Sequence, residues 1–408
     1  MNLLKNLKIK RRVIASLVGA HFYGNPSSKL KIIGVTGTNG KTTTATMLYR
    51  LTTALGYKAG LIGTVENILV DESRPSTHTT PGPIALNKLL KEMAEKGCEY
   101  VFMEVSSHAI DQKRIAGIHF VGGIFTNLTH DHLDYHKTFE RYFLAKKTFF
   151  DSLPKSAFAL SNADDLHGIA MITDTKAKKI TYGFSGKEDF SGEIVKLGFS
   201  GIQIYVSEKE INSSLIGKFN AYNILAVYST SILLGFNQEE VIKKLATILP
   251  PVGRFEYFTS ENKVLGVVDF AHTPDALEKI ILTTRDILPE GGKVISVFGC
   301  GGDRDPLKRR IMGKISAELS DISIFTSDNP RSENPQKIIE MMRTDLSMSE
   351  VAKIKIIIDR TDAINEACKI ARSGDVVLLL GKGHEGYLEI KGVKHPWNDM
   401  EKLKQALK

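Results

Sequence analysis

A short glycine-bounded loop, set between an apolar run and a helix-favouring stretch, constrains this chain more than any other feature. The run at 30–35 is followed by Gly37-Thr38-Asn39-Gly40-Lys41-Thr42-Thr43. Glycines let a backbone curl so that N–H groups face phosphate oxygens, and the helix that follows adds its positive dipole. Lys41 is then expected to reach the β- and γ-phosphates, and Thr42 to hold Mg²⁺. The loop predicts a strand, loop, helix unit that binds ATP, although Val35 replaces the first glycine of the strict pattern.

Composition is that of a globular protein with two or three domains. The 408 residues are 42% hydrophobic and 25% charged, and a domain usually has about 150 residues. Cys98, Cys300 and Cys368 form no C-x-x-C pair, so neither a disulfide framework nor a thiolate zinc site is indicated and a cytoplasmic location is expected. The formal charge of +8 is spread along the chain without a nucleic-acid motif. We therefore expect anionic small-molecule substrates and no nucleic acid.

The N-terminal region has a basic stretch at 5–12 followed by an apolar stretch at 13–20. This order superficially resembles a signal peptide, but the apolar part is short for one and an enzyme that consumes ATP belongs in the cytoplasm. No run reaches the roughly 18 apolar residues of a membrane span. Membrane insertion is therefore not expected.

Strand and helix signals alternate along the chain and predict an α/β fold with mostly parallel sheets. In the first part, strands are predicted at 32–35, 100–105, 122–125 and 157–160, and helices at 84–96, 139–150, 219–234 and 238–249. A period of two between about 190 and 214 predicts an antiparallel edge or flap. Pro250-Pro251 and Gly253 mark a domain boundary. After it, strands are predicted at 264–270, 293–298, 322–326, 353–358 and 375–380, and helices at 276–288, 310–320, 335–346 and 362–372.

Polar side chains follow two of the predicted strands. An isolated Glu104 at a strand end would most simply cap the next helix, but its place one strand beyond a phosphate loop favours a Mg²⁺ ligand. His130, His132 and His136 follow the strand at 122–125. They suggest zinc only weakly, and a second Mg²⁺ or a phosphate contact suits histidines beside carboxylates at a strand end better.

Eight short strings together resemble the Mur ligases, and within that family the enzymes that add the third amino acid of the peptidoglycan stem. They are residues 34–43, 77–81 (T-H-T-T-P), 104–108, 127–136, 269–276 (D-F-A-H-T-P-D-A), 299–305 (G-C-G-G-D-R-D), 328–331 (D-N-P-R) and 381–385 (G-K-G-H-E). The resemblance runs from about Phe22 to Trp397 in the family's order. It implies ATP-dependent amide formation, in which a substrate carboxylate takes the γ-phosphate and the incoming amine attacks the acyl phosphate.

The resemblance also implies a domain plan and a set of metal ligands. Residues 29–250 would form a P-loop-type central ATPase domain, and 251–408 a Rossmann-like amino-acid-binding domain. Glu104 and His132 would be metal ligands beside Thr42. Lys146 matches the lysine that the family carbamylates with CO₂, which turns a cation into a carboxylate-like ligand for a second Mg²⁺. Its neighbour Lys147 is the competing candidate, but the spacing from Tyr142 favours Lys146. Without the family match, two lysines on a helix would indicate a solvated face.

Substrate contacts are implied in the same way. Those expected at the UDP-N-acetylmuramoyl-dipeptide acceptor are Thr79, Thr80, Ser106, Gln112 and Arg114. Asn220 and Asn223 would lie near adenine, although Asn at a helix start is otherwise simply a cap. The residues expected at meso-diaminopimelate are Arg304, Asp328, Asn329, Pro330, Arg331, Gly381 and Glu385. Arg331 would grip the distal carboxylate, which lysine lacks, and Glu385 would face the distal ammonium. Without the other motifs, D-N-P-R would indicate a surface turn with a solvated arginine.

Full-length Mur ligases carry an N-terminal domain for the uridine diphosphate end, and here only 11–28 precedes the ATP domain. Residues 1–28 are expected to be the remnant linker of that domain. Either the uridine site is lost, another polypeptide supplies it, or the chain is N-terminally shortened.

Two other functions remain open. A folylpolyglutamate-synthase-like ligase is disfavoured by T-H-T-T-P and D-N-P-R, and a non-catalytic Mur-like nucleotide-binding module by the intact Lys41, Glu104, His132 and Lys146.

Overall fold

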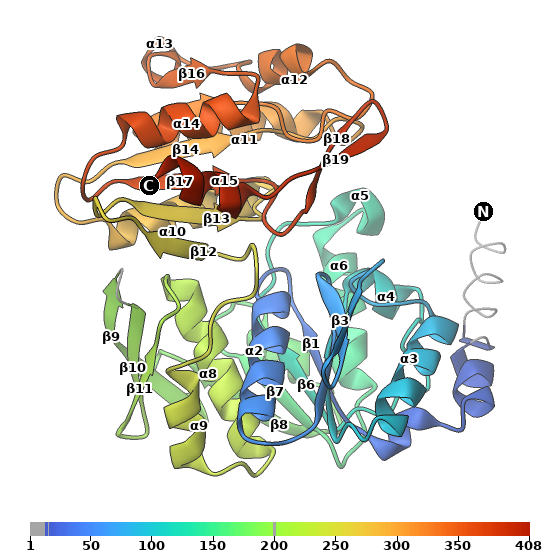
Figure 1. The fold of residues 1–408 in the computed structure, drawn as a ribbon. Helices are drawn as coiled ribbons and strands as arrows, with labels where there is room; N and C mark the ends of the chain where they lie inside the picture. Colours follow the sequence, from blue (N-terminus) through green and yellow to red (C-terminus); the bar gives the residue numbers. More distant parts are fainter. Residues whose placement is uncertain (1–12, 15, 199–200) are drawn as a thin grey trace. The chain divides into compact units, whose positions relative to one another are not determined.

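The computed structural model describes residues 13–14, 16–198 and 201–408. They form two compact units, which divide between Leu249 and Pro250. Both units are α/β with mostly parallel sheets, which confirms the predicted fold class (Figure 1). Of the predicted linker, residues 1–12 and 15 lie outside the described residues, and 16–22 are helical.

The first unit is built on an eleven-stranded sheet in the order β11-β10-β9-β8-β7-β6-β1-β5-β2-β3-β4. Its strands are β1 (Lys31–Thr36), β2 (Ala59–Ile62), β3 (Glu66–Leu69), β4 (Glu72–Pro75), β5 (Tyr100–Glu104), β6 (Gly122–Phe125), β7 (Phe158–Asn162), β8 (Lys178–Gly183), β9 (Phe190–Gly198), β10 (Gly201–Val206) and β11 (Lys209–Ser213). From β2 to β9 neighbouring strands pair in parallel, whereas β2-β3, β3-β4 and β10-β11 pair antiparallel. The predicted antiparallel edge is therefore present at β10-β11, but β9 runs parallel to β8.

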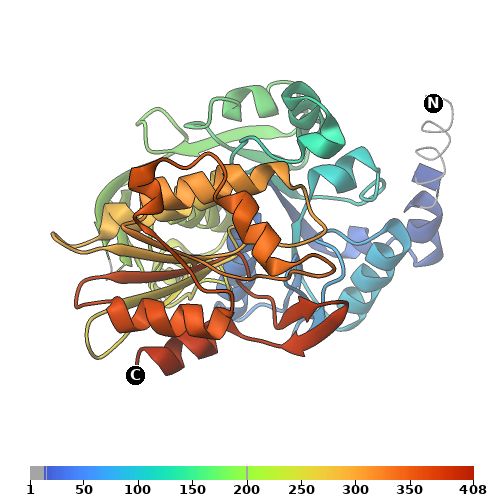
Figure 2. The same ribbon diagram turned by 90° about the horizontal axis from the view of Figure 1, so that it is seen from above.

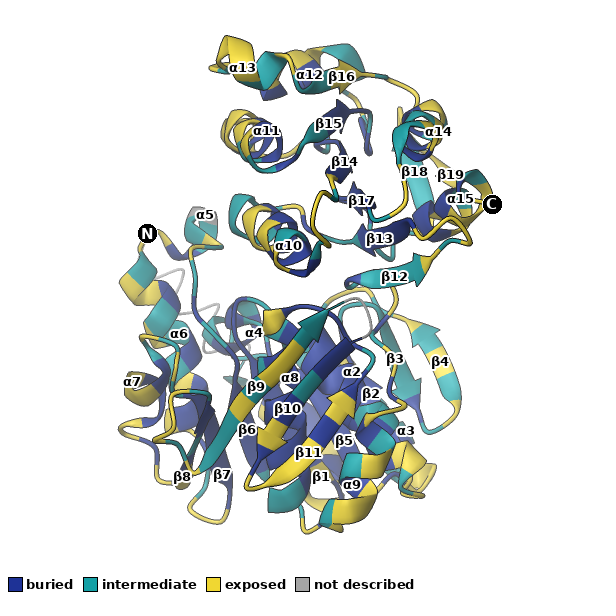
Figure 3. Cartoon of the chain, turned by 90° about the vertical axis from the view of Figure 1, so that its left-hand side faces the viewer, coloured by how far each residue is buried: buried dark blue, intermediate teal, exposed yellow. Residues whose placement is uncertain are grey.

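Helices cover both faces of this sheet because its central strands are apolar on both sides. They are α2 (Lys41–Ala54), α3 (Pro83–Glu95), α4 (Ser107–Asp111), α5 (Leu133–His136), α6 (Phe139–Asp151), α7 (Gly168–Ile172), α8 (Lys218–Leu233) and α9 (Gln238–Leu245), and a 3₁₀ turn at Pro26–Lys29 precedes β1. In β1, Ile33 packs into the core under α2, α8 and α9, while Ile32 packs into the core under α3, α6 and α7. The burial colours of Figure 3 follow this layering, with the outer surfaces of β10 and β11 partly exposed.

The second unit has a six-stranded sheet in the order β12-β13-β17-β14-β15-β16. Its elements are β12 (Glu256–Thr259), β13 (Leu265–Asp269), α10 (Pro274–Ile287), β14 (Val294–Phe298), α11 (Leu307–Leu319), β15 (Ile322–Phe325), α12 (Pro335–Met342), α13 (Met348–Val351), β16 (Ile354–Ile356), α14 (Arg360–Ile370), β17 (Val376–Leu380), a hairpin of β18 (Tyr387–Ile390) and β19 (Val393–Pro396), and α15 (Asp399–Ala406). Only β12 pairs antiparallel within the large sheet. Helices α10 and α11 lie on one face and α14 and α15 on the other (Figure 2).

Parallel strands bring their carboxyl ends to one edge of a sheet, which is where ligands bind in such folds. In the first unit that edge carries the loops after β1, β5 and β6. In the second unit it carries the loops after β13, β14, β15 and β17. Seven of the eight strings named in the sequence therefore fall on these two edges, and the eighth, at 77–81, follows β4.

Candidate active site

The glycine-bounded loop leaves β1 at Gly37 and enters α2 at Lys41. Gly37 has φ 156°, and a Cβ there would lie 1.9 Å from Oγ1 of Thr126. The end of β6 holds the loop, since Thr126 Oγ1 donates to the Asn39 carbonyl at 2.6 Å and the Asn39 N–H donates to Asn127 Oδ1 at 2.9 Å. Such a close backbone approach is what a phosphate cradle requires, so the loop geometry fits a triphosphate.

Two lysines meet at this loop. Lys41 Nζ donates to the carbonyls of Gly37 at 2.9 Å and Thr38 at 2.8 Å, and Lys146 Nζ, from α6, donates to the same Gly37 carbonyl at 2.7 Å. Lys146 is only 1% exposed, whereas Lys147 points outward to Asp151 and Asp174. Burial, and then the charge of Lys41, lower the pKa of Lys146 well below its usual value, although Asp131 opposes the shift. Two cationic groups converging on a phosphate-type loop suit an anionic ligand.

Glu104 lies at the end of β5 and is buried. Its Oε2 accepts hydrogen bonds from Thr42 Oγ1 at 2.9 Å and Thr64 Oγ1 at 3.0 Å, and its Oε1 accepts from the Thr64 N–H at 2.6 Å. The structure thus brings the predicted pair Thr42 and Glu104 together. A carboxylate and a hydroxyl are hard oxygen donors of the kind Mg²⁺ prefers, so the pair fits that ion. Thr64 was not predicted, because a single threonine before β3 carries no recognisable pattern.

The residues expected at the acceptor gather beside Glu104. Thr80 Oγ1 donates to the Glu104 carbonyl at 2.8 Å and accepts from the Ser106 N–H at 3.1 Å. Arg114 donates to the Thr80 carbonyl at 2.8 Å and to Gln112 Oε1 at 2.8 and 3.1 Å. Thr79 completes the group, since its Oγ1 accepts from Thr64 Oγ1 at 3.1 Å. The five predicted residues therefore form one polar group at the end of β5.

The histidines do not behave as one metal cluster. Among the described residues, no group of three or more His, Cys, Asp or Glu side chains has a metal-binding arrangement. His136 is buried against Ser107 Oγ at 3.0 Å, while His130 is exposed. His132 lies with its ring 6.1 Å from that of Tyr142. Partial desolvation, and then the charges of His108, Lys41 and Lys146, lower the pKa of His132 against the opposing effect of Asp131.

Tyr142 of α6 contacts both Lys146 and the phosphate loop, and no functional role was predicted for it. Its ring lies 4.6 Å from Lys146 Nζ, and its hydroxyl is 3.0 Å from Thr38 Oγ1. It therefore joins α6 to the phosphate loop. The signal available in the sequence was its place four residues before Lys146 on one helix, which puts both on the same face.

Asn220 and Asn223 lie inside α8 and do not cap it, because the N-cap residue is Gly217. Asn223 Oδ1 accepts from Thr44 Oγ1 of α2 at 3.3 Å, and Asn223 Nδ2 donates to Asn220 Oδ1 at 2.9 Å. Both are buried. The two asparagines thus face the first turn of the helix that follows the phosphate loop, and their contact with adenine stays a prediction.

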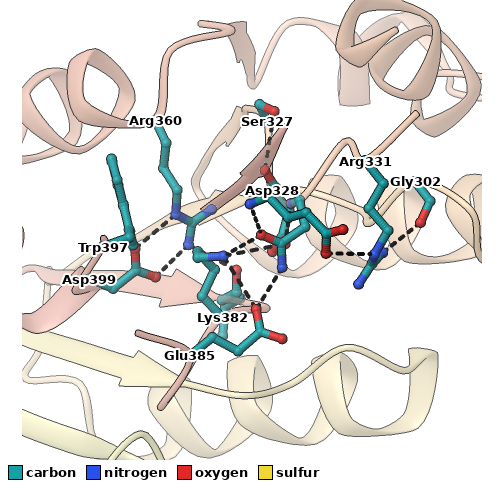
Figure 4. Close-up of polar contacts among 12 residues, drawn as sticks. Gly302, Ser327, Asp328, Arg331, Arg360, Lys382, Glu385, Trp397 and Asp399 are labelled. Atoms are coloured by element: carbon teal, nitrogen blue, oxygen red, sulfur yellow. Dashed lines mark hydrogen bonds and ion pairs between the residues drawn. The ribbon is translucent and has the colours of Figure 1, made fainter. Parts of the chain in front are cut away.

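In the second unit, the D-N-P-R and G-K-G-H-E loops form one polar cluster after β15 and β17 (Figure 4). Asn329 Nδ2 donates to Glu385 Oε2 at 2.7 Å. Gly381 has φ 105°, and a Cβ there would lie 2.7 Å from Asp328 Oδ2. Lys382, inside G-K-G-H-E, is fully buried beneath these side chains. No role was predicted for Lys382, although it lies within the string G-K-G-H-E.

Arg331 is held at the rim of this cluster and is not a freely solvated surface arginine. Its backbone has φ 51°, its Nη1 donates to the Gly302 carbonyl at 2.6 Å, and its Nε lies 3.5 Å from Glu389 Oε2. Arg304 is exposed and comes near Arg331 across Gly301, whose Cβ would lie 3.0 Å from Arg331 Nη1 and 3.8 Å from Arg304 Cγ. The two arginines predicted at diaminopimelate therefore share one small region.

A second unpredicted pair fastens the loops that carry these arginines. Arg309 of α11 is buried and binds Glu333 with two hydrogen bonds of 2.7 and 2.8 Å. Arg309 also donates to the Gly301 carbonyl at 3.2 Å, and Glu333 accepts from the Asp303 N–H at 2.6 Å. The pair thus ties the 299–305 loop to the 328–333 loop. No local sequence pattern predicts the Arg309–Glu333 pair, because the two residues are far apart in the sequence.

Within the part of the chain that the structure describes, none of the helices is both long enough and apolar enough to cross a bilayer.

Comparison with protein families gives two matches. Residues 35–230 match the model of the Mur ligase middle domain, and residues 253–383 match that of the Mur ligase glutamate ligase domain. Among curated proteins, the UDP-N-acetylmuramoyl-L-alanyl-D-glutamate–2,6-diaminopimelate ligase of Cytophaga hutchinsonii is 51% identical over 391 residues, which are 96% of this chain and 80% of the relative. The ligase of the same name from Bacteroides fragilis is 53% identical over 384 residues, covering 94% of this chain and 79% of the relative.

Solved structures agree with these matches. A structure of UDP-N-acetylmuramoyl-L-alanyl-D-glutamate–2,6-diaminopimelate ligase superposes with a TM-score of 0.67 at 32% identity, over 93% of this chain and 78% of that one. Folylpolyglutamate synthase from Thermotoga maritima superposes with a TM-score of 0.71 over 90% of both chains, but at 16% identity. The second likeness therefore concerns the fold alone.

Proposed function

Since the chain belongs to the Mur ligase family, we propose that it joins meso-diaminopimelate to UDP-N-acetylmuramoyl-L-alanyl-D-glutamate at the expense of ATP, in the cytoplasmic synthesis of peptidoglycan precursors. The names of relatives with 51 and 53% identity support this reaction. The observation that carries the choice of amino acid is the cluster after β15 and β17, where Arg331 and Glu385 offer a cation and a carboxylate at one sheet edge. Such a pair suits an amino acid whose side chain ends in both an ammonium and a carboxylate.

The reaction would proceed in two steps, formation of an acyl phosphate and attack by the amine. An oxygen of the acceptor carboxylate bonds to the γ-phosphorus as ADP leaves, and the amine of the amino acid then bonds to the acyl carbon. The tetrahedral intermediate expels phosphate, and the amine loses a proton. Within the first unit, Lys41 would neutralise charge that builds on the transferred phosphoryl group, and the backbone of the glycine-bounded loop would cradle the phosphates.

For the metal, we assign Thr42, Glu104, His132 and Lys146 as ligands of Mg²⁺, which would supply charge neutralisation at the phosphates. Support comes from the 2.9 Å contact of Thr42 with Glu104 and from the position of Lys146 at the loop. Lys146 carrying a carbamate would place a negative group where the amino groups of Lys41 and Lys146 now meet. Lys146 is 1% exposed at the loop, whereas Lys147 pairs with Asp151 and Asp174, and this contrast favours Lys146 as the modified residue.

We assign the ATP-binding part to 29–250 and the amino-acid-binding part to 251–408. The acceptor would lie along Thr79, Thr80, Ser106, Gln112 and Arg114, because hydrogen bonds join these residues into one polar group next to Glu104. A separate UDP-binding polypeptide is no part of this proposal, because nothing in the relatives points to one. Asn220 and Asn223 are assigned to the adenine side of the nucleotide.

The test is amino-acid-dependent release of ADP by the purified chain, with the product mass determined for each of a panel of amino acids. With the UDP-muramoyl-dipeptide, meso-diaminopimelate should support turnover well above lysine or glutamate, and the product should gain the mass of one diaminopimelate residue. Lys41→Ala should be folded and inactive. Turnover with glutamate and a folate acceptor would instead establish the folylpolyglutamate-like ligase, and a folded wild type without any turnover would favour the nucleotide-binding module.

A further inference from the structure

Lys382 is a fully buried ammonium at the centre of the polar cluster of the second unit (Figure 4). Its Nζ lies 3.0 Å from Asn329 Oδ1, 3.3 Å from Glu385 Oε2 and 3.8 Å from Asp328 Oδ1. Burying a charge is costly unless it is paired and hydrogen-bonded. A lysine in this position therefore has to be explained by what it does for its three partners.

The contacts of Lys382 fix which way the Asn329 amide points. Asn329 Oδ1 accepts two hydrogen bonds, from Lys382 Nζ at 3.0 Å and from the Glu389 N–H at 2.8 Å. Two donors on one side require the oxygen there, so the amino group must face the other way. Asn329 Nδ2 consequently donates to Glu385 Oε2 at 2.7 Å.

Glu385 is held from two sides by this arrangement. Its Oε2 takes both the Asn329 amino group and Lys382 Nζ, which directs Oε1 as the oxygen for a ligand cation. The side chain of Glu385 is 19% exposed, whereas Lys382 beneath it has no exposed side-chain surface. A ligand can therefore reach Glu385 but would not touch Lys382.

The neighbouring arginine cannot take over this task. Arg360 is buried and already bound to Asp399 by hydrogen bonds of 2.6 and 2.9 Å, and Trp397 donates to the same carboxylate at 2.7 Å. Lys382 is thus the cation in contact with both Asp328 and Glu385. Losing it would leave two carboxylates at the sheet edge without that contact and would leave the Glu389 N–H as the one donor that holds the Asn329 oxygen.

We propose that Lys382 is a positioning residue of the amino-acid site, which orients Glu385, by its own contact and through Asn329, for the distal ammonium of the amino acid. The inference rests on the proposed function and deepens it, because it concerns how the same site selects its amino acid. Lys382 acts on the amino acid only through its neighbours and takes no part in phosphoryl transfer.

The test measures KM separately for meso-diaminopimelate, ATP and the acceptor. Lys382→Met, which keeps length and removes the charge, should raise KM for diaminopimelate by about 10- to 100-fold, the usual effect of losing a charged hydrogen bond. KM for ATP and acceptor should change less than about 3-fold. The matched control is Lys353→Met, because Lys353 also binds carbonyls of this unit, at 3.3 to 3.4 Å, but lies outside the cluster. That control should leave all three KM values unchanged.

A double-mutant cycle separates positioning from direct contact. If Lys382 acts on the amino acid through Glu385, Lys382→Met should cost little more in a background that already carries Glu385→Ala. Additive losses, an equal rise in all three KM values, or no rise for diaminopimelate would each overturn the inference. If Lys382→Met does not fold, Asn329→Asp is the deciding variant. It keeps an oxygen for Lys382 and removes the donor to Glu385, so an unchanged KM for diaminopimelate would overturn the inference.

Failure of the proposed function looks different from failure of this inference. A folded wild type that does not use diaminopimelate would overturn both. A wild type that uses diaminopimelate, with a Lys382→Met variant of unchanged KM, would overturn the inference alone.

Discussion

Single residues on this chain derive their chemistry from burial and from one or two neighbours. Lys146 and Lys147 are adjacent on α6, yet Lys146 is 1% exposed at the phosphate loop and Lys147 pairs with two aspartates at the surface. A buried amine next to another cation favours its neutral, nucleophilic form. Of these two neighbours, Lys146 is therefore the one that we propose reacts with CO₂.

Lys146→Ala should be nearly inactive and should regain part of its activity with added short carboxylic acids, which can occupy the place of the lost carbamate. The measurement is ADP release with and without the added acid. Lys147→Ala is the control and should keep close to wild-type activity. Full wild-type activity after CO₂ depletion, together with an unmodified Lys146 by intact-mass analysis, would contradict the assignment.

Arg331→Ala should weaken the use of diaminopimelate by roughly 10- to 150-fold, from about 1.5–3 kcal/mol for a charged hydrogen bond. The use of lysine should change far less, because lysine has no distal carboxylate. The measurement is kcat/KM for both amino acids. Arg310→Ala serves as the control, since Arg310 is exposed and pairs with Asp345. An equal loss with both amino acids would mean that Arg331 supports its loop and does not select the ligand.

At the scale of elements, the loops at the carboxyl ends of strands are held by contacts with other strands and helices. The loop after β1 depends on Thr126 and Asn127 at the end of β6. The loops after β14 and β15 depend on Arg309 of α11 and on Glu333. Substitutions at these contact residues should therefore change the conformation of a loop, although the residues themselves need not contact a ligand.

Gly37→Ala should disrupt the phosphate loop, because its new Cβ would lie 1.9 Å from Thr126 Oγ1 and 3.2 Å from the Asn127 nitrogen. We expect a loss of about 1–3 kcal/mol in the free energy of unfolding, typical of overpacking, and a loss of nucleotide binding. Thermal melting and titration with an ATP analogue would measure the two effects. Gly82→Ala is the control, since its Cβ would meet nothing within 4 Å. Equal behaviour of the two variants would contradict the steric explanation.

The Arg309–Glu333 pair should make the stability of the second unit depend on acidity. Hydrogen bonds from Arg309, and then from the Asp303 N–H, lower the pKa of Glu333 from 4.5 to about 2. A lowered folded-state pKa stabilises the fold fully above about pH 4.5 and loses this effect as pH falls toward 2. The excess Tm of wild type over Glu333→Gln should therefore shrink between pH 5 and 2. The shift should be modest, because Glu333 is 34% exposed and water screens the pair.

Glu278→Gln, which changes an exposed residue of α10, is the control for that pH series. Its Tm should follow that of wild type throughout. A constant Tm difference between wild type and Glu333→Gln across the range would show that the ionisation of Glu333 does not contribute.

At the scale of the molecule, each unit contains its own sheet and core. All strands of the six-stranded sheet lie between Glu256 and Leu380, and its core is closed by α14 and α15. A domain of about 150 residues buries roughly two thirds of its surface, which is enough for independent stability.

The fragment 250–408 should therefore fold alone and melt in one cooperative transition. Circular dichroism in the far and near ultraviolet would follow the melting, with the whole chain as the reference. A fragment with helical signal but no near-ultraviolet signal and no cooperative transition would contradict the prediction, because fixed packing would then require the first unit.

The sequence by itself determined the fold class and most elements, because apolar periodicity and turn residues are local. The predicted strand at 122–125 coincides with β6 and the predicted helix at 139–150 with α6. Strands such as β4 and β19 were not predicted, because their mostly polar residues form no apolar run. Motif residues at strand ends were predicted as neighbours, and Thr42 and Glu104 do meet.

Only the tertiary structure decided which residues contact and position the predicted site residues. The four residues Thr64, Tyr142, Arg309 and Lys382 lie inside the candidate sites, yet each gains its role from a partner on another element. Burial also depends on the tertiary structure. Lys146 and His136 are buried, whereas their neighbours in sequence Lys147 and His130 are less buried or exposed. Local patterns specify secondary structure, whereas the pairing of distant side chains and their removal from water exist only once the chain has folded.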